Sequence, residues 1–210
     1  MDITWLGHSC FRIKSNQAVI ITDPVPAETG YTLGKQTANI VTVSHPHPSH
    51  SWVQGVEGEP HIVKGPGEYE ISGVLVIGVS TFHDAVKGSA RGKNTMYLMD
   101  IDGVAVCHTG DLGHVPGDDQ VEEMGNVDVL MLPVGGASTI NATLATEVVR
   151  KLEPRIVIPM HYKTEKTTRD LDGVDLFLKE MGQSGIEPRN KVSVTRNNLP
   201  ASAQVYVLTV

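Results

Sequence analysis

Short apolar runs separated by turn residues make up most of the first half of the chain. Branched and aromatic side chains gather in these runs, and turn residues such as Gly7-His8-Ser9 and Ser15-Asn16 separate them. Runs of this length and composition predict β-strands, and the short breaks predict antiparallel neighbours. The predicted strands are residues 3–6, 10–14, 18–22, 40–44, 61–64, 68–71, 74–80, 94–101 and 104–108. Asp102-Gly103, between the last two, favours a type I′ hairpin turn.

The last third of the chain alternates between strands and helices. Residues 127–132 and 156–159 are continuous apolar runs, which are typical of buried strands. Apolar residues at helical spacing predict two helices that end before Pro154 and near Gly182, and closing strands are expected around residues 192 and 204–210. The elements predict an α/β (α+β) fold of two sheets packed face to face with helices outside. We expect residues 1–210 to form one domain.

Composition narrows the class of protein. Hydrophobic residues make up 40% of the 210 residues, and no apolar run approaches the ~20 residues that cross a bilayer. The first residues, Met1-Asp2-Ile3-Thr4-Trp5, lack the features of a signal peptide, so we expect a cytoplasmic protein without membrane contact. Cys10 and Cys107 lie far apart and form no CxxC pattern, which argues against a disulfide framework or a thiolate zinc site.

Charge argues against nucleic-acid binding. The formal net charge is −7, whereas binding to phosphate backbones requires clustered Lys and Arg. Lys163, Lys166 and Arg169 are the nearest approach to a basic cluster, and they follow His161 closely. They can line the mouth of a site and attract an anionic substrate, or they can form a solvated surface turn.

The densest candidate chemistry is the stretch Ser44-His45-Pro46-His47-Pro48-Ser49-His50. Three histidines lie within six residues at the end of a predicted strand. In an extended segment His45 and His47 project to the same side, and the prolines stiffen the segment. Ser49 is a typical helix N-cap, so we expect a helix to begin there, with His50 in its first turn. The alternative is a solvated turn that happens to be rich in histidine.

Histidine or aspartate stands at the exit of four predicted strands. These places are His45 to His50, His83-Asp84, His108 to Asp111, and His161. Loops that leave one edge of a sheet meet in space, so these side chains can assemble one site. The irregular stretch 82–93 is expected to be a long loop of this kind. Imidazole and carboxylate groups suit zinc and also manganese or iron.

Five motifs in order carry a resemblance to a known family. They are Trp5-Leu6-Gly7-His8-Ser9-Cys10-Phe11, Thr22-Asp23-Pro24, the histidine stretch, His108-Thr109-Gly110-Asp111 and Ile158-Pro159-Met160-His161-Tyr162. Together they resemble the metallo-β-lactamase-fold hydrolases, and more narrowly the small zinc-dependent hydrolases similar to the ascorbate-6-phosphate lactonase family. The resemblance implies a four-layered αββα sandwich with a metal site at one edge of the sheets.

The resemblance also implies roles for individual residues. One metal ion would be bound by His45, His47 and His83, and a second by the residue at 49 with His50 and His161, with Asp111 bridging the two. Asp23 matches an aspartate that steadies a ligand loop by hydrogen bonding. His8 and His108 lie beside the expected site, where they either satisfy the core or handle substrate. The candidate catalytic residues are Asp111, His50, His161 and His108.

Ser49 departs from the family pattern, His-x-His-x-Asp-His, at the position of its aspartate. A serine hydroxyl is a weaker metal ligand than a carboxylate. We therefore expect zinc as one or two ions, with manganese or iron as alternatives, and a weakened second position.

The expected function is metal-dependent hydrolysis of a small ester, lactone or phosphorylated metabolite by a metal-activated water. The substrate is expected to be a small molecule, with an anion compatible with the basic residues. Homo-oligomerisation is an expectation from the related lactonases. The first alternative is a non-catalytic protein that binds metal or senses a ligand, because Ser49 replaces the aspartate. The second is a purely structural protein whose histidines satisfy the core.

Overall fold

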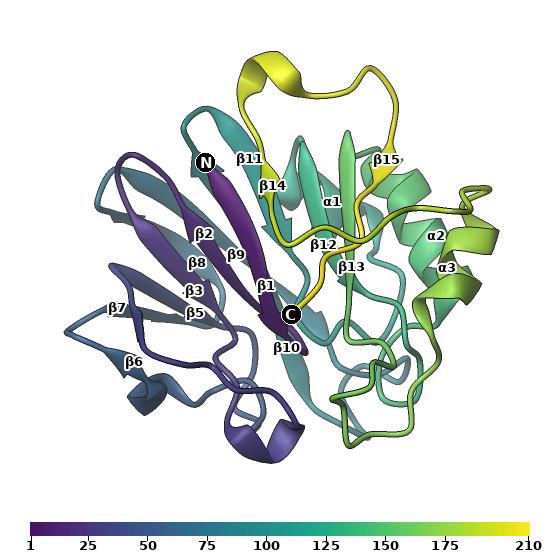
Figure 1. Cartoon of the computed structure of the whole chain (residues 1–210), viewed down its shortest axis with the longest axis horizontal. Coiled ribbons are helices and arrows are strands. Elements are labelled where there is room, and N and C mark those ends of the chain that lie inside the picture. The colour runs from purple at the N-terminus through teal and green to yellow at the C-terminus, as the bar shows by residue number, and fades with distance from the viewer.

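Two β-sheets pack face to face, and the longest helix lies beyond the second sheet (Figure 1). The computed structural model describes all 210 residues. The first sheet has six strands, in the spatial order β14 (Val192–Ser193), β1 (Asp2–Gly7), β2 (Cys10–Lys14), β3 (Val19–Thr22), β5 (Ile40–Val43) and β7 (His61–Lys64). The second has seven, in the order β15 (Gln204–Val205), β13 (Ile156–Met160), β12 (Val129–Pro133), β11 (Val104–His108), β10 (Lys93–Ile101), β9 (Val74–Phe82) and β8 (Gly67–Ile71).

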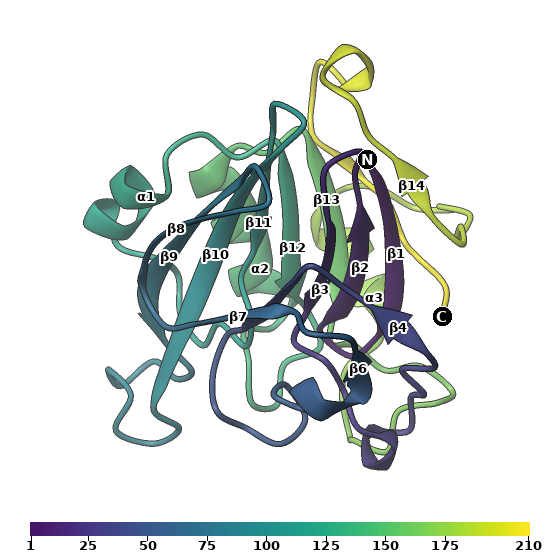
Figure 2. The same cartoon turned by 90° about the vertical axis from the view of Figure 1, so that its left-hand side faces the viewer.

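The helices cover the second sheet. α2 (Ala142–Leu152) packs against both β12 and α3 (Val174–Glu180), as Figure 1 shows, while α1 (Asp118–Met124) lies against β9 (Figure 2). Asn141 caps α2, because its side-chain oxygen accepts a hydrogen bond from the backbone N–H of Leu144 at 3.0 Å. The remaining elements are the 3-10 turns η1 (Ala27–Thr29), η2 (Val53–Gly55) and η3 (Arg196–Asn198) and a ribbon of β4 (Gln36–Thr37) and β6 (Val56–Glu57).

Strand direction brings distant loops to one edge of the sandwich. β1, β2 and β3 are antiparallel neighbours as predicted, while β3, β5 and β7 run parallel. In the second sheet β9, β10 and β11 are antiparallel, and β11, β12 and β13 are parallel. β1, β3 and β5 therefore end at one edge of their sheet, and β9, β11 and β13 end at one edge of theirs.

The main core lies between the two sheets and beneath α2 and α3. Side chains from both ends of the chain, including Ile3 and Leu208, belong to this one cluster, and on this basis we propose that residues 1–210 form one domain. A separate cluster of eight residues lies on the outer face of the first sheet. There, Ile21 and Val41 of the sheet pack with Tyr31 and Leu33 of the 24–39 loop.

The main departures from the sequence predictions lie in turns and short elements. The predicted helix start at Ser49 is wrong, because residues 48–50 form a turn and the N–H of Trp52 donates to the carbonyl of Pro24 at 3.1 Å. α1 is missing from the predictions because Met124 is its one buried residue, which leaves almost no apolar pattern to detect. The closing strands β14 and β15 are shorter than expected, with two residues each. No helix combines the length and apolar character needed to cross a membrane.

Candidate metal centre

Strand exits deliver the functional side chains to one edge of the sandwich. His8 follows β1, Asp23 follows β3, the 44–50 turn follows β5, His83 follows β9, Asp111 comes shortly after β11, and His161 follows β13. The backbone N–H of His161 donates to the carbonyl of His8 at 3.1 Å, so the loops of the two sheets meet directly. Three of these residues have positive φ, namely His8 (54°), Asp23 (39°) and His161 (52°). Such strained conformations cluster at functional sites.

Asp111 is the centre of the cluster. Its Oδ2 lies 3.2 Å from Nε2 of His50, 3.3 Å from Nε2 of His83, 3.7 Å from Nε2 of His161 and 4.0 Å from Nε2 of His45. One carboxylate oxygen therefore faces four imidazole nitrogens. All five side chains are buried.

Buried polar residues behind Asp111 hold it in place. The side-chain oxygen of Asn94 accepts a hydrogen bond from the backbone N–H of Asp111 at 3.0 Å, and the hydroxyl of Ser9 donates to Oδ1 at 3.4 Å. Asn94 is fixed in turn, because its amide donates to Thr81 and to the carbonyl of Thr109. Sequence reasoning missed Asn94 and Ser9, since their contacts join residues far apart in the chain.

Asp23 orients His50. Its Oδ1 accepts from the backbone N–H of Ser44 at 2.7 Å, and its Oδ2 accepts from the hydroxyl of Ser44 at 2.6 Å. The same Oδ2 lies 2.8 Å from Nδ1 of His50. This contact directs Nε2 of His50 towards Asp111, which is the way outer hydrogen bonds orient metal-binding imidazoles.

Electrostatics leave carboxylates and mostly neutral imidazoles in the centre. Burial lowers the pKa of His45 and of His161 to about 4, and it holds the pKa of His8 well below its usual range. Burial opposes charge on His50 as well, but the carboxylates of Asp111 and Asp23 raise its pKa to about 10. Burial disfavours the Asp111 anion, yet the neighbouring imidazoles of His50 and His161 hold its pKa well below the ordinary value.

The donor set fits a divalent metal ion. Several buried ring nitrogens have no hydrogen-bond partner, namely Nε2 of His8, Nε2 of His45, Nε2 of His50, Nδ1 of His83 and both nitrogens of His161. An unpartnered buried polar atom costs about 1–3 kcal/mol, so such a concentration needs a compensating interaction. Neutral imidazoles around a carboxylate are the ligands that zinc, manganese and iron accept.

The predicted ligand His47 lies at the rim of the cluster. Its side chain is exposed, and its Nδ1 lies 2.7 Å from the hydroxyl of Ser49. The His47 and His45 rings stack with centroids 5.9 Å apart, so the expected projection to one side is observed. The Ser49 hydroxyl also accepts a hydrogen bond from Nη2 of Arg169 at 3.2 Å.

His108, expected as a catalytic candidate, is fully buried behind the centre. Its Nε2 lies 2.8 Å from the carbonyl of Ser9, and its Nδ1 accepts from the backbone N–H of Gly110 at 3.3 Å. Neither ring nitrogen is free to face a substrate. The side chain instead joins the turn after β1 to the Asp111 loop.

A polar cavity of about 630 Å³ opens onto the centre. Its lining residues are His45, Pro46, His47, His83, Arg91, Gly92, Lys93, Asp111, Ser138 and Arg169. Of the basic cluster anticipated after His161, Arg169 lines this cavity, whereas Lys163 donates to the carbonyl of Arg169 and Lys166 to that of Val210. Arg91 and Lys93, at the end of the stretch 82–93 that is expected to be a long loop, also line the cavity but are absent from the predicted site.

The two-sheet sandwich and the histidine-aspartate cluster together define a protein of the metallo-β-lactamase class. The family model described as "Beta-lactamase superfamily domain" matches residues 2–161. The chain therefore belongs to the β-lactamase superfamily, within its metallo-β-lactamase-fold group.

Individual relatives agree with this placement. A Zn-dependent hydrolase of the metallo-β-lactamase superfamily from Thermotoga maritima is 38% identical, with a TM-score of 0.82 over 99% of this chain and 97% of that chain. A UPF0173 metal-dependent hydrolase from Methanoregula boonei is 27% identical over 197 residues, covering 82% of this chain and 87% of its own length. Another from Pyrococcus furiosus is 28% identical over 194 residues, covering 78% and 85%. The expected fold, family and hydrolase class are confirmed.

Proposed function

We propose that the protein hydrolyses a small anionic ester, lactone or phosphorylated metabolite in a metal-dependent reaction. The observation that carries this proposal is the convergence of four imidazole Nε2 atoms on Oδ2 of Asp111 beside a basic cavity. Relatives named as metal-dependent hydrolases support it. The basic lining of the cavity favours a substrate that carries negative charge.

Zinc is the proposed metal, as one or two ions, with manganese or iron as alternatives. His45, His83 and Asp111 would bind one ion, and His47 is the further ligand that the family resemblance supplies. His50 and His161 would bind a second ion beside Asp111. When bound, a divalent ion lowers the pKa of a coordinated water to roughly 7 and polarises the substrate oxygen.

The chain's own groups would position the reactants. Arg91, Lys93 and Arg169 would bind the anionic group at the cavity wall, and Oδ2 of Asp111 would hold a proton of the attacking water. Asp23 would keep His50 in a productive orientation, and His108 would act as a positioning residue. A cytoplasmic location, homo-oligomerisation and the absence of nucleic-acid partners stay predictions.

The test is a hydrolysis assay on phosphomonoesters, phosphodiesters and lactones with added zinc or manganese. We expect turnover that falls to background in Asp111→Ala and His83→Ala, while Asp100→Ala, an exposed change on β10, stays at the wild-type rate. Circular dichroism would verify that each variant is folded. Undiminished turnover in Asp111→Ala would contradict the proposal, and metal binding without turnover on any substrate class would favour the sensing alternative.

A further inference from the structure

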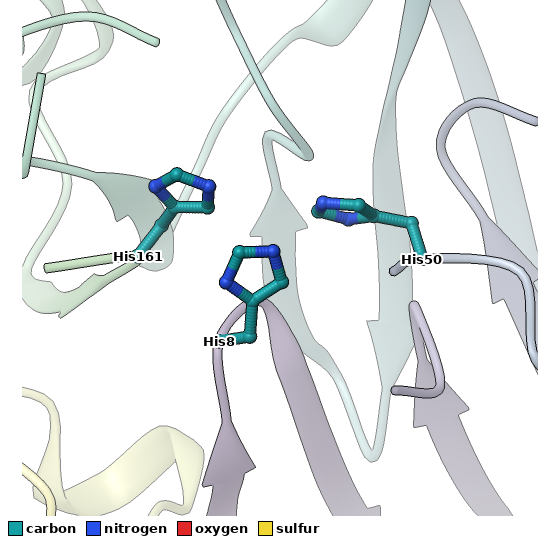
Figure 3. Close-up of side chains that lie close together, drawn as sticks. All are labelled: His8, His50 and His161. Atoms are coloured by element: carbon teal, nitrogen blue, oxygen red, sulfur yellow. The ribbon is translucent and has the colours of Figure 1, made fainter. Parts of the chain in front are cut away.

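His8, His50 and His161 form a second group of side chains that could hold a metal ion, beside the group of His45, His83 and Asp111. Figure 3 shows the three rings converging from separate segments of the chain. The His8 ring centroid lies 4.3 Å from that of His161 and 4.8 Å from that of His50. One nitrogen of each ring lies within 4.8 Å of one nitrogen of each of the others. The family resemblance did not predict His8 as a metal ligand.

Each member of this group has a free, buried nitrogen. His8 is 2% exposed, His50 and His161 are fully buried, and Nε2 of all three lacks a hydrogen-bond partner. The charged group beside these nitrogens is the Asp111 carboxylate, whose Oδ2 lies 3.2 Å from Nε2 of His50 and 3.7 Å from Nε2 of His161. A divalent cation would satisfy all three through their lone pairs, and its binding would release the ring proton that Asp111 and Asp23 favour on His50.

His8 is held rigidly in this position. Its carbonyl accepts hydrogen bonds from Nε1 of Trp5 at 3.0 Å and from the backbone N–H of His161 at 3.1 Å. The second of these bonds fixes His8 and His161 relative to each other. The positive φ of His8 adds a strained backbone, which persists where the surroundings enforce it.

The hydroxyl of Ser49 interacts with residues outside this group of three histidines. This hydroxyl lies 2.7 Å from Nδ1 of His47 and accepts a hydrogen bond from Nη2 of Arg169 at 3.2 Å. Asp23 lies close enough to His45 and His50 to share a metal ion with them. Its carboxylate, however, already contacts the backbone N–H and the hydroxyl of Ser44 as well as Nδ1 of His50. His8 is the remaining side chain that can complete the second set.

We propose that His8 is a metal ligand that binds a second divalent ion together with His50 and His161, in place of the aspartate that Ser49 replaces. Oδ2 of Asp111 lies 3.2 Å from Nε2 of His50 and 3.7 Å from Nε2 of His161, so its negative charge adjoins this site as well as the His45–His83 site. The proposal rests on the metal centre of the proposed function and names the residue that makes it binuclear.

The test is metal stoichiometry by elemental analysis together with Mn²⁺ electron paramagnetic resonance, neither of which depends on turnover. Wild-type protein should bind two equivalents and show a spin-coupled spectrum. His8→Asn should bind one equivalent and lose the coupling, because asparagine tolerates positive φ but lacks the imidazole. His8→Ala, checked by near-ultraviolet circular dichroism, should behave in the same way. Ser49→Ala is the matched control and should keep two equivalents.

Four results would overturn the proposal, and they differ in what they imply for the proposed function. Two equivalents in folded His8→Asn and His8→Ala would show that His8 is no ligand. If Ser49→Ala lost one ion and the His8 variants lost none, Ser49 and not His8 would be the ligand of the second ion. One equivalent in the wild type, lost in His83→Ala, would leave the proposed hydrolase standing with a mononuclear centre, whereas no metal at all would remove the proposed function itself.

Discussion

Replacement of Asp23 by asparagine should weaken metal binding, because it puts an amide donor in place of the acceptor Oδ2 that contacts Nδ1 of His50 and the hydroxyl of Ser44. The amide oxygen of Asp23→Asn has to face the backbone N–H of Ser44, because an amide nitrogen there would meet another donor. The amide nitrogen then replaces Oδ2, which lies 2.8 Å from Nδ1 of His50. An N–H at this place donates to Nδ1, so the single ring proton of His50 moves to Nε2 and removes the lone pair that a metal needs.

The expected size follows from the loss of one oriented ligand. Loss of an outer hydrogen bond to a metal-binding histidine typically reduces affinity by about 10–100-fold. This corresponds to about 1.4–2.8 kcal/mol of binding free energy. The shape of the side chain is unchanged, so the protein should remain folded and the loss should appear in metal affinity.

The assay is a Zn²⁺ titration against a competing chromophoric chelator. Asp100→Asn, an exposed change on β10, is the matched control and should bind with wild-type affinity. An affinity of Asp23→Asn within twofold of the wild type would refute the orientation argument. Equal losses in both variants would mean that the effect comes from net charge.

Three further changes test the surroundings of the centre. Gly110→Ala should lower the free energy of unfolding by about 1–3 kcal/mol in urea titrations, because φ is +58° and a Cβ would lie 2.4 Å from Oδ1 of Asn94. Gly103→Ala, where φ is +73° and the space is open, should cost less, and equal losses would contradict the steric argument. Removal of metal by a chelator should lower the melting temperature, and zinc should restore it; an unchanged melting temperature would argue against a metal-stabilised fold. Asp84→Asn should destabilise the 84–92 loop at neutral pH, measured by hydrogen exchange. Burial opposes the Asp84 anion, but four backbone N–H donors lower its pKa from 3.8 to about 2, so its contribution is complete above pH 3.8 and is lost as pH falls towards 2. A difference from the wild type that grows on acidification would contradict this sign.

Local pattern was sufficient to predict most of the strands and the edge at which the candidate site residues meet. Asp23, His45, His83 and His161 stand at or just beyond strand ends, so strand prediction placed them at one edge. The limit lies in contacts between distant residues. His108 and Ser9 are 99 positions apart, and their hydrogen bond, which engages Nε2 of His108, could not be read from the sequence.

The sequence could not show which of the neighbouring basic residues line the cavity, because that also depends on contacts between distant residues. Arg169, Lys163 and Lys166 lie close together in the chain, yet only Arg169 of these three lines the cavity. Lys93 also lines it, from the start of β10, where it pairs with Phe82 at the end of β9. The predicted helix start at Ser49 is wrong because the Ser49 hydroxyl contacts His47 and Arg169. A helix N-cap would instead accept hydrogen bonds from the backbone N–H groups that follow it. Two of the deciding contacts join residues far apart in the chain, namely Arg169 with Ser49 and Lys166 with Val210.

The small apolar cluster outside the first sheet has a consequence for how the protein opens. Its residues flank Asp23 and the 44–50 turn, and they are separate from the main core. Such a unit exchanges between closed and open forms at a lower free energy than global unfolding. Metal binding by the proposed ligands of the 44–50 turn should therefore stabilise this unit, and its protection from hydrogen exchange should rise with metal occupancy.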